Sequence, residues 1–214
     1  MTEFEFRQCE WAECRFRFPS EVETPRAIRC PRCGAATNTA GLPAPVLADP
    51  SVETSNPTFS ALLDNIRSIH NVGSMFRSAD GAGIHHLYLC GMTATPAHPK
   101  LGKAALGSQE FVNWSYDLNG VDLVLRLKEQ GHQLWGIEAA EGAQLFFETD
   151  LVTRNQNITF IVGNERAGID PGILALCDRT LYLPMAGHKR SLNVAVTFGI
   201  ISYYLNFARP LENI

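Results

Sequence analysis

The chain has 214 residues, of which 45% are hydrophobic and 19% are charged, a composition that supports an ordinary globular core. Its formal net charge of −4 argues against a large, purely electrostatic nucleic-acid surface, although an acidic protein can still carry a local basic patch. The first residues are acidic rather than basic, and no run approaches the roughly 20 apolar residues of a membrane span. We therefore expect a soluble, cytoplasmic protein without a signal peptide.

Four of the six cysteines crowd the first 34 residues with the spacing C-x4-C-x15-C-x2-C: Cys9, Cys14, Cys30 and Cys33. Two short-spaced pairs suit a tetrahedral zinc site of four thiolates, and Gly34 lets the backbone fold back so that its amides face the sulfurs. The alternatives are two disulfides or four unrelated core cysteines. A cytoplasmic location disfavours disulfides, and so short a segment has too little core without a staple. We predict a zinc ribbon over residues 1–36 with a structural zinc ion.

A linker is expected next. Residues 37–57 contain four prolines and no aromatic residue, which is typical of a semi-extended connection. The remaining residues, 58–214, form the larger predicted domain.

This larger segment alternates short apolar runs with helical patterns, which predicts an α/β domain with a largely parallel sheet. The expected strands are Phe59–Leu63, His85–Cys90, Gln133–Glu138, Ile158–Gly163 and Thr180–Leu183. The expected helices are Val72–Ala82, Val121–Gln130, Pro171–Cys177 and Leu192–Phe207. Asp170 followed by Pro171 favours a helix start, because a capping side chain precedes a proline at the first helical position.

The first polar cluster lies on the helix expected after the first strand of this domain. We expect Asn71 to cap this helix and Gly83 to end it. Helical spacing turns four residues toward the core: Val72, Met75, Phe76 and Ala79. It places three polar residues on the other side: Asn71, Ser74 and Arg77. The spacing by itself favours a solvated helix face over a functional one.

The second cluster is Gly163-Asn164-Glu165-Arg-Ala-Gly168, in which a buried strand runs into a loop with a glycine on each side of a carboxylate. The two glycines permit tight turns and close approach by a ligand. Neither a dinucleotide fingerprint nor a phosphate-binding loop is present in this segment. A ligand loop and an ordinary turn both fit this pattern.

The third cluster follows the last expected strand. A loop with Gly187 leads to Ser191 and Asn193 at the start of an apolar helix. Two polar side chains at such a position suggest buried hydrogen bonding, and plain capping by Ser191 is the alternative.

Together and in this order, the three clusters resemble the motifs of the SpoU/TrmH branch of SPOUT RNA methyltransferases. Asn71 and Arg77 lie six residues apart, Gly163 to Gly168 reads G-x-E-x-x-G, and Ser191–Val194 reads Ser-Leu-Asn-Val. The resemblance covers residues 59–210. The cysteine-rich segment is not part of the usual pattern, and the basic extensions frequent in the family are missing.

The resemblance implies a SPOUT fold, in which the carboxy-terminal part of a mostly parallel sheet with helices on both faces threads into a trefoil knot. It implies S-adenosylmethionine as methyl donor and a homodimer that brings the first motif to the partner's cofactor. The residues expected at the cofactor are Gly163, Asn164, Glu165, Gly168, Leu183, Met185, Leu192 and Asn193.

The implied reaction is methylation of a ribose 2′-hydroxyl in tRNA or rRNA. Arg77 matches the family's catalytic position, where we expect it to fix the hydroxyl, since a guanidinium stays protonated. The residues expected to support it are Asn71, Glu165, Ser191 and Asn193. Two rival hypotheses are methylation of a base nitrogen and a binding module, for RNA or protein, whose methyltransferase domain has lost its activity.

Overall fold

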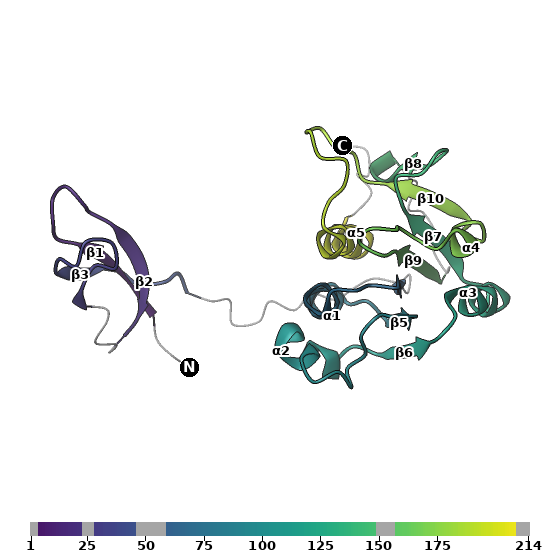
Figure 1. Ribbon diagram of the computed structural model, residues 1–214, viewed down its shortest axis with the longest axis horizontal. Coiled ribbons are helices and arrows are strands. Elements are labelled where there is room, and N and C mark those ends of the chain that lie inside the picture. Colours follow the sequence, from purple (N-terminus) through teal and green to yellow (C-terminus); the bar gives the residue numbers. More distant parts are fainter. Residues whose placement is uncertain (1–3, 23–27, 46–58, 149–156, 209–214) are drawn as a thin grey trace. The chain divides into compact units, whose positions relative to one another are not determined.

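The computed structural model describes residues 4–22, 28–45, 59–148 and 157–208 and divides the chain into two units, residues 1–52 and 53–214. The first unit holds an antiparallel sheet in the order β2-β1-β3 (Figure 1), with β1 at Phe4–Cys9, β2 at Arg17–Glu21 and β3 at Thr37–Gly41. The prediction that the linker begins at residue 37 is therefore wrong, because pairing with β1 makes Thr37–Gly41 a strand. The rest of the predicted linker is described only as far as residue 45.

The second unit is built on a seven-stranded sheet in the order β6-β5-β4-β9-β7-β10-β8, and all its described strand pairs are parallel. The strands are β4 (Phe59–Asp64), β5 (His86–Cys90), β6 (Trp114–Asp117), β7 (Gln133–Ile137), β8 (Gln144–Leu145), β9 (Ile158–Val162) and β10 (Arg179–Tyr182). The predicted α/β domain with a largely parallel sheet is confirmed.

Helices cover both faces of this sheet (Figure 1). One face carries α1 (Ile69–Ala82), α2 (Leu101–Ala105) and α5 (Val194–Phe207), and the other carries α3 (Gly120–Glu129) and α4 (Pro171–Leu174). Two short 3-10 helices, Ser108–Glu110 and Phe146–Glu148, complete the described elements of this unit. The central strand β4 is buried on both sides, with Ala61 and Leu63 in one core and Leu62 in the other. This explains its continuous apolar sequence.

Two helix starts differ from the prediction. Ser68, not Asn71, caps α1, since its side chain accepts a hydrogen bond from the Asn71 backbone N–H. Asn193, not Ser191, caps α5 by accepting from the N–H of Ala195. The expected cap of α4 by Asp170 is present. Asn71 and Asn193 therefore lie at the beginnings of two helices, where their side-chain amides can hydrogen-bond to each other.

Besides the two 3-10 helices, three short elements of the second unit were not predicted: β6, β8 and α2. β6 is an edge strand of four residues, and its Trp114 and Tyr116 are more than a third exposed. Such a strand lacks the buried, apolar run that made the central strands recognisable. No helix among the described residues is both long and apolar enough to cross a lipid bilayer.

Close packing of α1 on α2 depends on Gly73. A Cβ at Gly73 would lie 2.5 Å from Ala104 Cβ and 2.9 Å from the Ala105 backbone nitrogen. We predict that Gly73→Ala lowers the free energy of unfolding by about 1–3 kcal/mol, because the backbone of α2 must move. Gly102→Ala is the matched control, since its Cβ would approach only Gln109 Nε2 at 3.5 Å. Denaturant unfolding of both variants checks this, and wild-type stability in Gly73→Ala would contradict the close approach.

Candidate functional site

A cavity of about 460 Å³ opens at the carboxyl ends of β7, β9 and β10. Open parallel sheets bind ligands at this edge, and the volume suits a small molecule. Three connections line it: residues 137–139 after β7, residues 163–168 after β9, and residues 183–197 after β10. The site is thus made of loops that a rigid sheet brings together.

The structure places all eight residues expected at the cofactor along this cavity, together with Ser191. Arg77 lies elsewhere. It is exposed on α1 and lines a separate shallow hollow with Ser74, Ser78 and Tyr203. Within one chain, the expected catalytic arginine and the cavity are therefore not brought together.

Glu165 connects the loop after β9 to the start of α1. Its carboxylate accepts hydrogen bonds from the backbone N–H groups of Arg67 and Ser68, both at 3.0 Å, and from Asn71 Nδ2 at 2.8 Å. Ser68 is the N-cap of α1 and Arg67 precedes it, so these N–H groups lie next to the amino-terminal end of the helix, where the helix dipole favours a negative charge. Glu165 acts as an anionic cap supplied by a distant part of the chain.

The electrostatics of Glu165 favour the ionised form. Partial burial by itself would raise its pKa, but the hydrogen bonds from the N–H groups of Arg67 and Ser68 and from Asn71 outweigh it and lower the pKa below its ordinary value of 4.5. Near neutral pH the side chain is therefore a carboxylate with all of its bonds directed to protein donors. This suits a positioning role and makes it a poor proton acceptor.

The same network extends to α5. Asn193 Nδ2 donates to Asn71 Oδ1 at 3.2 Å, while Asn193 Oδ1 caps α5. One residue from each of the three sequence clusters therefore joins a single chain of hydrogen bonds, from Glu165 through Asn71 to Asn193. This arrangement ties two loops of the cavity to the start of α1.

Asp64 and Asn65 do not line the cavity but hold the loop after β9 in place, and the sequence reasoning missed them. Asp64 is 1% exposed, and its Oδ2 accepts from the Asp170 N–H at 2.9 Å, at the far end of the loop after β9. Asn65, in the left-handed conformation, accepts a bond from Asn164 Nδ2 at its backbone oxygen. Burial raises the pKa of Asp64. A carboxylate at the end of a continuous apolar run was the available signal in the sequence.

The loop after β9 is itself tightly folded. The side chain of Asn164 bonds only within this framework, to the Asn65 oxygen and to the N–H groups of Arg166 and Ala167. A Cβ at Gly163 would lie 2.2 Å from the carbonyl carbon of Gly168, so only glycine fits at that position. Asn164 therefore shapes the cavity wall, with its side-chain amide occupied.

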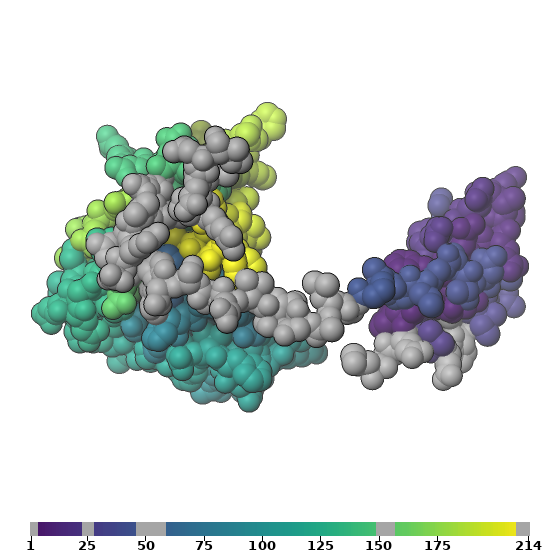
Figure 2. All heavy atoms as spheres, turned by 180° about the vertical axis from the view of Figure 1, so that it is seen from behind, coloured from purple at the N-terminus to yellow at the C-terminus, as the bar shows by residue number. Residues whose placement is uncertain are grey.

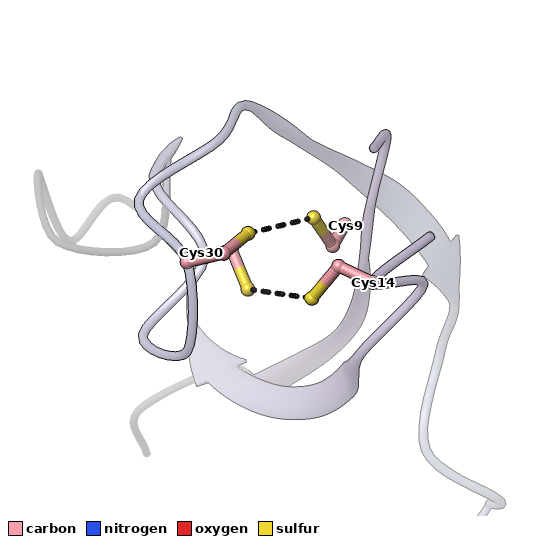
Figure 3. Close-up of side chains that lie close together, drawn as sticks. Cys9, Cys14 and Cys30 are labelled. Carbon is pink, nitrogen blue, oxygen red and sulfur yellow. Dashed lines mark hydrogen bonds between the residues drawn. The ribbon is translucent and has the colours of Figure 1, made fainter. Parts of the chain in front are cut away.

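The amino-terminal cysteines also come together. The sulfurs of Cys9, Cys14, Cys30 and Cys33 all lie within 4.8 Å of one another, and Figure 3 shows the three labelled thiols pointing inward. The Cys9–Cys33 and Cys14–Cys30 sulfurs are 3.4 and 3.9 Å apart, and all four cysteines are free thiols rather than disulfides. Four sulfurs at about 2.3 Å from one zinc ion would be roughly 3.8 Å apart.

Backbone turns support this sulfur cluster. Gly34, with φ +76°, donates its N–H to the Cys30 oxygen at 2.8 Å. Burial would raise the pKa of the Cys30 thiol, but backbone N–H groups of Cys33 and Arg32 act against it and the pKa falls to about 7. Among the described residues of this unit, only Cys9, Cys30 and Thr37 are buried. Two of the cluster's own cysteines thus make up most of the unit's buried interior.

Comparison with known proteins identifies the family. Residues 58–203 match the model of the SpoU rRNA Methylase family, which covers more than half of the chain. The chain belongs to the SpoU rRNA methylase family. The resemblance suggested by the three motifs is thereby confirmed, whereas the cysteine-rich unit lies outside the matched region.

Relatives within this family include named RNA methyltransferases. The chain is 31% identical over 196 residues to the 23S rRNA (guanosine(2553)-2′-O)-methyltransferase RlmP of Bacillus subtilis, covering 88% of this chain and 76% of that protein. It is 31% identical to the tRNA (guanosine(18)-2′-O)-methyltransferase of Escherichia coli, covering 69% of this chain but only 62% of that enzyme.

A solved structure supports the same assignment. The SpoU methyltransferase AviRb from Streptomyces viridochromogenes, in complex with the cofactor AdoMet, superposes with a TM-score of 0.60 and 29% identity. The match covers 80% of this chain and 64% of that one.

The charge of Glu165 generates a pH prediction for this SpoU family member. A carboxyl group whose pKa is depressed in the folded state contributes stability above its unfolded pKa, and this is lost as pH falls through the folded value. We expect Glu165→Gln to be less stable than the wild type at pH 7, with the difference shrinking below about pH 4.5. Urea unfolding across this range measures it. A difference that stays constant with pH would contradict the ionised cap.

Proposed function

We propose that this chain is an S-adenosylmethionine-dependent methyltransferase that modifies a ribose 2′-hydroxyl in tRNA or rRNA. The observation that carries the proposal is the hydrogen-bond chain Glu165–Asn71–Asn193, which joins all three family motifs at the cavity. The names of the relatives, which act on tRNA and on rRNA, support the substrate class. A domain that had lost its activity would have no evident need to keep this network beside an open cavity.

The cavity fits the methyl donor in its chemistry. Apolar side chains of Leu183, Met185 and Leu192 suit an adenine ring, while Arg166 and Arg190 offer charge for a carboxylate. S-adenosylmethionine brings an already activated methyl group. The protein must therefore align the acceptor hydroxyl, exclude water and accommodate the departing proton. We propose that the loops around Gly163 and Leu183 hold adenine and ribose.

Arg77 is proposed to act on the acceptor from a second copy of the chain. It projects from α1 outside its own cavity, and no hydrogen bond or ion pair holds its guanidinium among the described residues. A free, planar guanidinium can bind a hydroxyl and a phosphate together, which suits a positioning role better than that of a base. In this proposal, the partner's Arg77 completes each cavity.

The surface beside Arg77 supports self-association. Helix α5 is apolar on nearly all sides, and three of its exposed residues lie on the side away from the core: Val196, Tyr203 and Phe207. Figure 2 shows part of α5, in yellow, at the surface of this unit. Tyr203 also borders the hollow that contains Arg77. A homodimer through α1 and α5 would cover these side chains and bring Arg77 to the partner.

The trefoil knot belongs to the same proposal. Strand β9 lies between β4 and β7, and β10 lies between β7 and β8. The chain then forms α5, which packs in the same core as α1. Threading of residues 183–193 through the preceding loops would account for the meeting of the second and third motifs.

We further propose that the sulfur cluster binds one structural zinc ion. The unit has few other buried residues, so that four thiolates on one ion would supply the staple that its small core lacks. No position would be left for a reactive water, because four protein ligands fill a tetrahedral site.

The zinc proposal predicts one zinc per chain in purified, tag-free protein. Cys30→Ser should lose the metal and unfold the first unit, while Cys177→Ser, in the other unit, should retain it. Elemental analysis with thiol titration measures both, and binding of S-adenosylmethionine should survive chelation because the second unit has its own core. Metal-free protein with all four thiols titratable would contradict the site.

The enzymatic proposal is tested with labelled S-adenosylmethionine and bulk tRNA and rRNA. We expect the wild type to yield 2′-O-methylated nucleosides after digestion. Arg77→Ala should bind the donor and lose methyl transfer, while Gly163→Val should lose donor binding through its clash with Gly168. Mixed dimers of these two variants should recover activity, since one of their two sites pairs an intact cavity with an intact Arg77.

The possible failures are distinguishable. A wild-type protein that labels neither RNA would refute the enzymatic proposal. Mixed dimers that form without recovering activity would refute the shared site and leave the enzymatic proposal intact. Full activity of Arg77→Ala by itself would refute the role of the first motif.

A further inference from the structure

Glu138 brings a second carboxylate to the cavity, and nothing in the proposed reaction uses it. It directly follows β7, and its backbone N–H donates to the Leu181 oxygen at 2.9 Å, which fixes it against β10. The residue is half-buried and lines the cavity. Its position at the carboxyl end of a central strand is therefore set by the sheet and not by a mobile loop.

The two oxygens of Glu138 differ in their surroundings. Oε2 accepts a hydrogen bond from the Ile169 N–H at 3.1 Å, and a Cβ at Gly168 would lie 2.5 Å from it. Oε1 has no hydrogen-bond donor among the residues that the structure describes. Glu165, in contrast, directs both oxygens to protein donors. Glu138 is thus the acidic residue of the cavity that keeps acceptor capacity for a ligand.

The position of this free oxygen suits a ribose. In doubly wound sheets that bind dinucleotides, an acidic side chain accepts from a ribose hydroxyl of the ligand, so a carboxylate at this edge of a parallel sheet can make the same bond. Glu138 contacts the backbone of Gly168 and Ile169, the loop that we assign to adenine and ribose. Arg166 and Arg190 line the same cavity and match the negative charge of the carboxylate in the amino-acid tail.

We propose that Glu138 binds a ribose hydroxyl of the methyl donor and thereby sets the preference of the cavity for a ribonucleoside. This inference rests on the proposed binding of S-adenosylmethionine. Sites built to hydrogen-bond a hydroxyl strongly reject the analogue that lacks it, because a buried polar group is then left unpaired. The carboxylate therefore acts on binding and on selectivity, while Arg77 acts on the acceptor.

Calorimetric titration of the full-length protein tests the proposal with three ligands. These are S-adenosylmethionine, S-adenosylhomocysteine without the sulfonium, and 5′-methylthioadenosine without the amino-acid tail. Glu138→Gln keeps an acceptor for the Ile169 N–H but loses the charge, and Glu138→Ala removes both. We expect the affinity for all three ligands to fall by about 10-fold or more in each variant. Glu141→Gln, an exposed neighbour outside the cavity, is the control and should bind normally.

The decisive comparison uses the 2′-deoxy and 3′-deoxy forms of 5′-methylthioadenosine. The wild type should bind at least one of them more weakly than the parent compound, and Glu138→Ala should lose this preference. Loss confined to ligands with the tail, or to the sulfonium compound, would overturn the assignment in favour of a charge contact. Unchanged affinity in both variants would overturn the assignment and leave Glu138 only as the hydrogen-bond acceptor of the Ile169 N–H. A wild type that binds none of the ligands would instead refute the underlying cofactor proposal.

Discussion

The hydrogen bonding of the Glu165 carboxylate to the amides of Arg67 and Ser68, directly before α1, is the interaction on which the site depends. It joins residues 98 positions apart in the chain and pairs N–H groups that lie just before the first turn of the helix. The alternative partner for these amides is water, which would leave the loop after β9 without its attachment to α1. Asn71 and Asn193 extend the same connection to α5. The loop after β9 is therefore attached to the start of α1, and Asn71 attaches the start of α1 to Asn193, the cap of α5.

Asp64 provides a second attachment for the loop after β9. It is buried at the end of β4 and bonds the backbone of Asp170, while the neighbouring Asn65 bonds Asn164. The loop is thus fixed at its beginning, its middle and its end by Asp64, the last residue of β4, and by the segment 65–68 that connects β4 to α1. Burying a carboxylate is costly, which is why the pKa of Asp64 is raised, and the hydrogen bonds offset that cost. Rigidity at the edge of the sheet is favourable for a reaction that depends on alignment.

The two units of the chain are stabilised in different ways. The larger one has apolar cores on both faces of its sheet, with Trp135, Phe76, Phe146 and Phe160 fully buried. The smaller one surrounds a cluster of sulfurs and a polar network in which Arg7 bonds Glu5 and Thr37. Among its described residues only Cys9, Cys30 and Thr37 are buried, so this unit has no apolar core comparable to that of the larger one.

The sequence by itself determined the α/β class, the main strands and helices, the cysteine cluster and the family, because these depend on local periodicity, short spacings and motif order. It also marked Asp170 as a cap, where a proline follows directly. The tertiary structure decided which side chains meet. In the structure, Ser68 caps α1 and Asn193 caps α5. The side chain of Asn164 is hydrogen-bonded to the Asn65 oxygen, and Arg77 lies outside the cavity. The tertiary structure also placed Glu138 in the cavity wall. The physical reason is that the order of strands in the sheet, with β9 between β4 and β7, brings distant loops together, and no local pattern encodes that order.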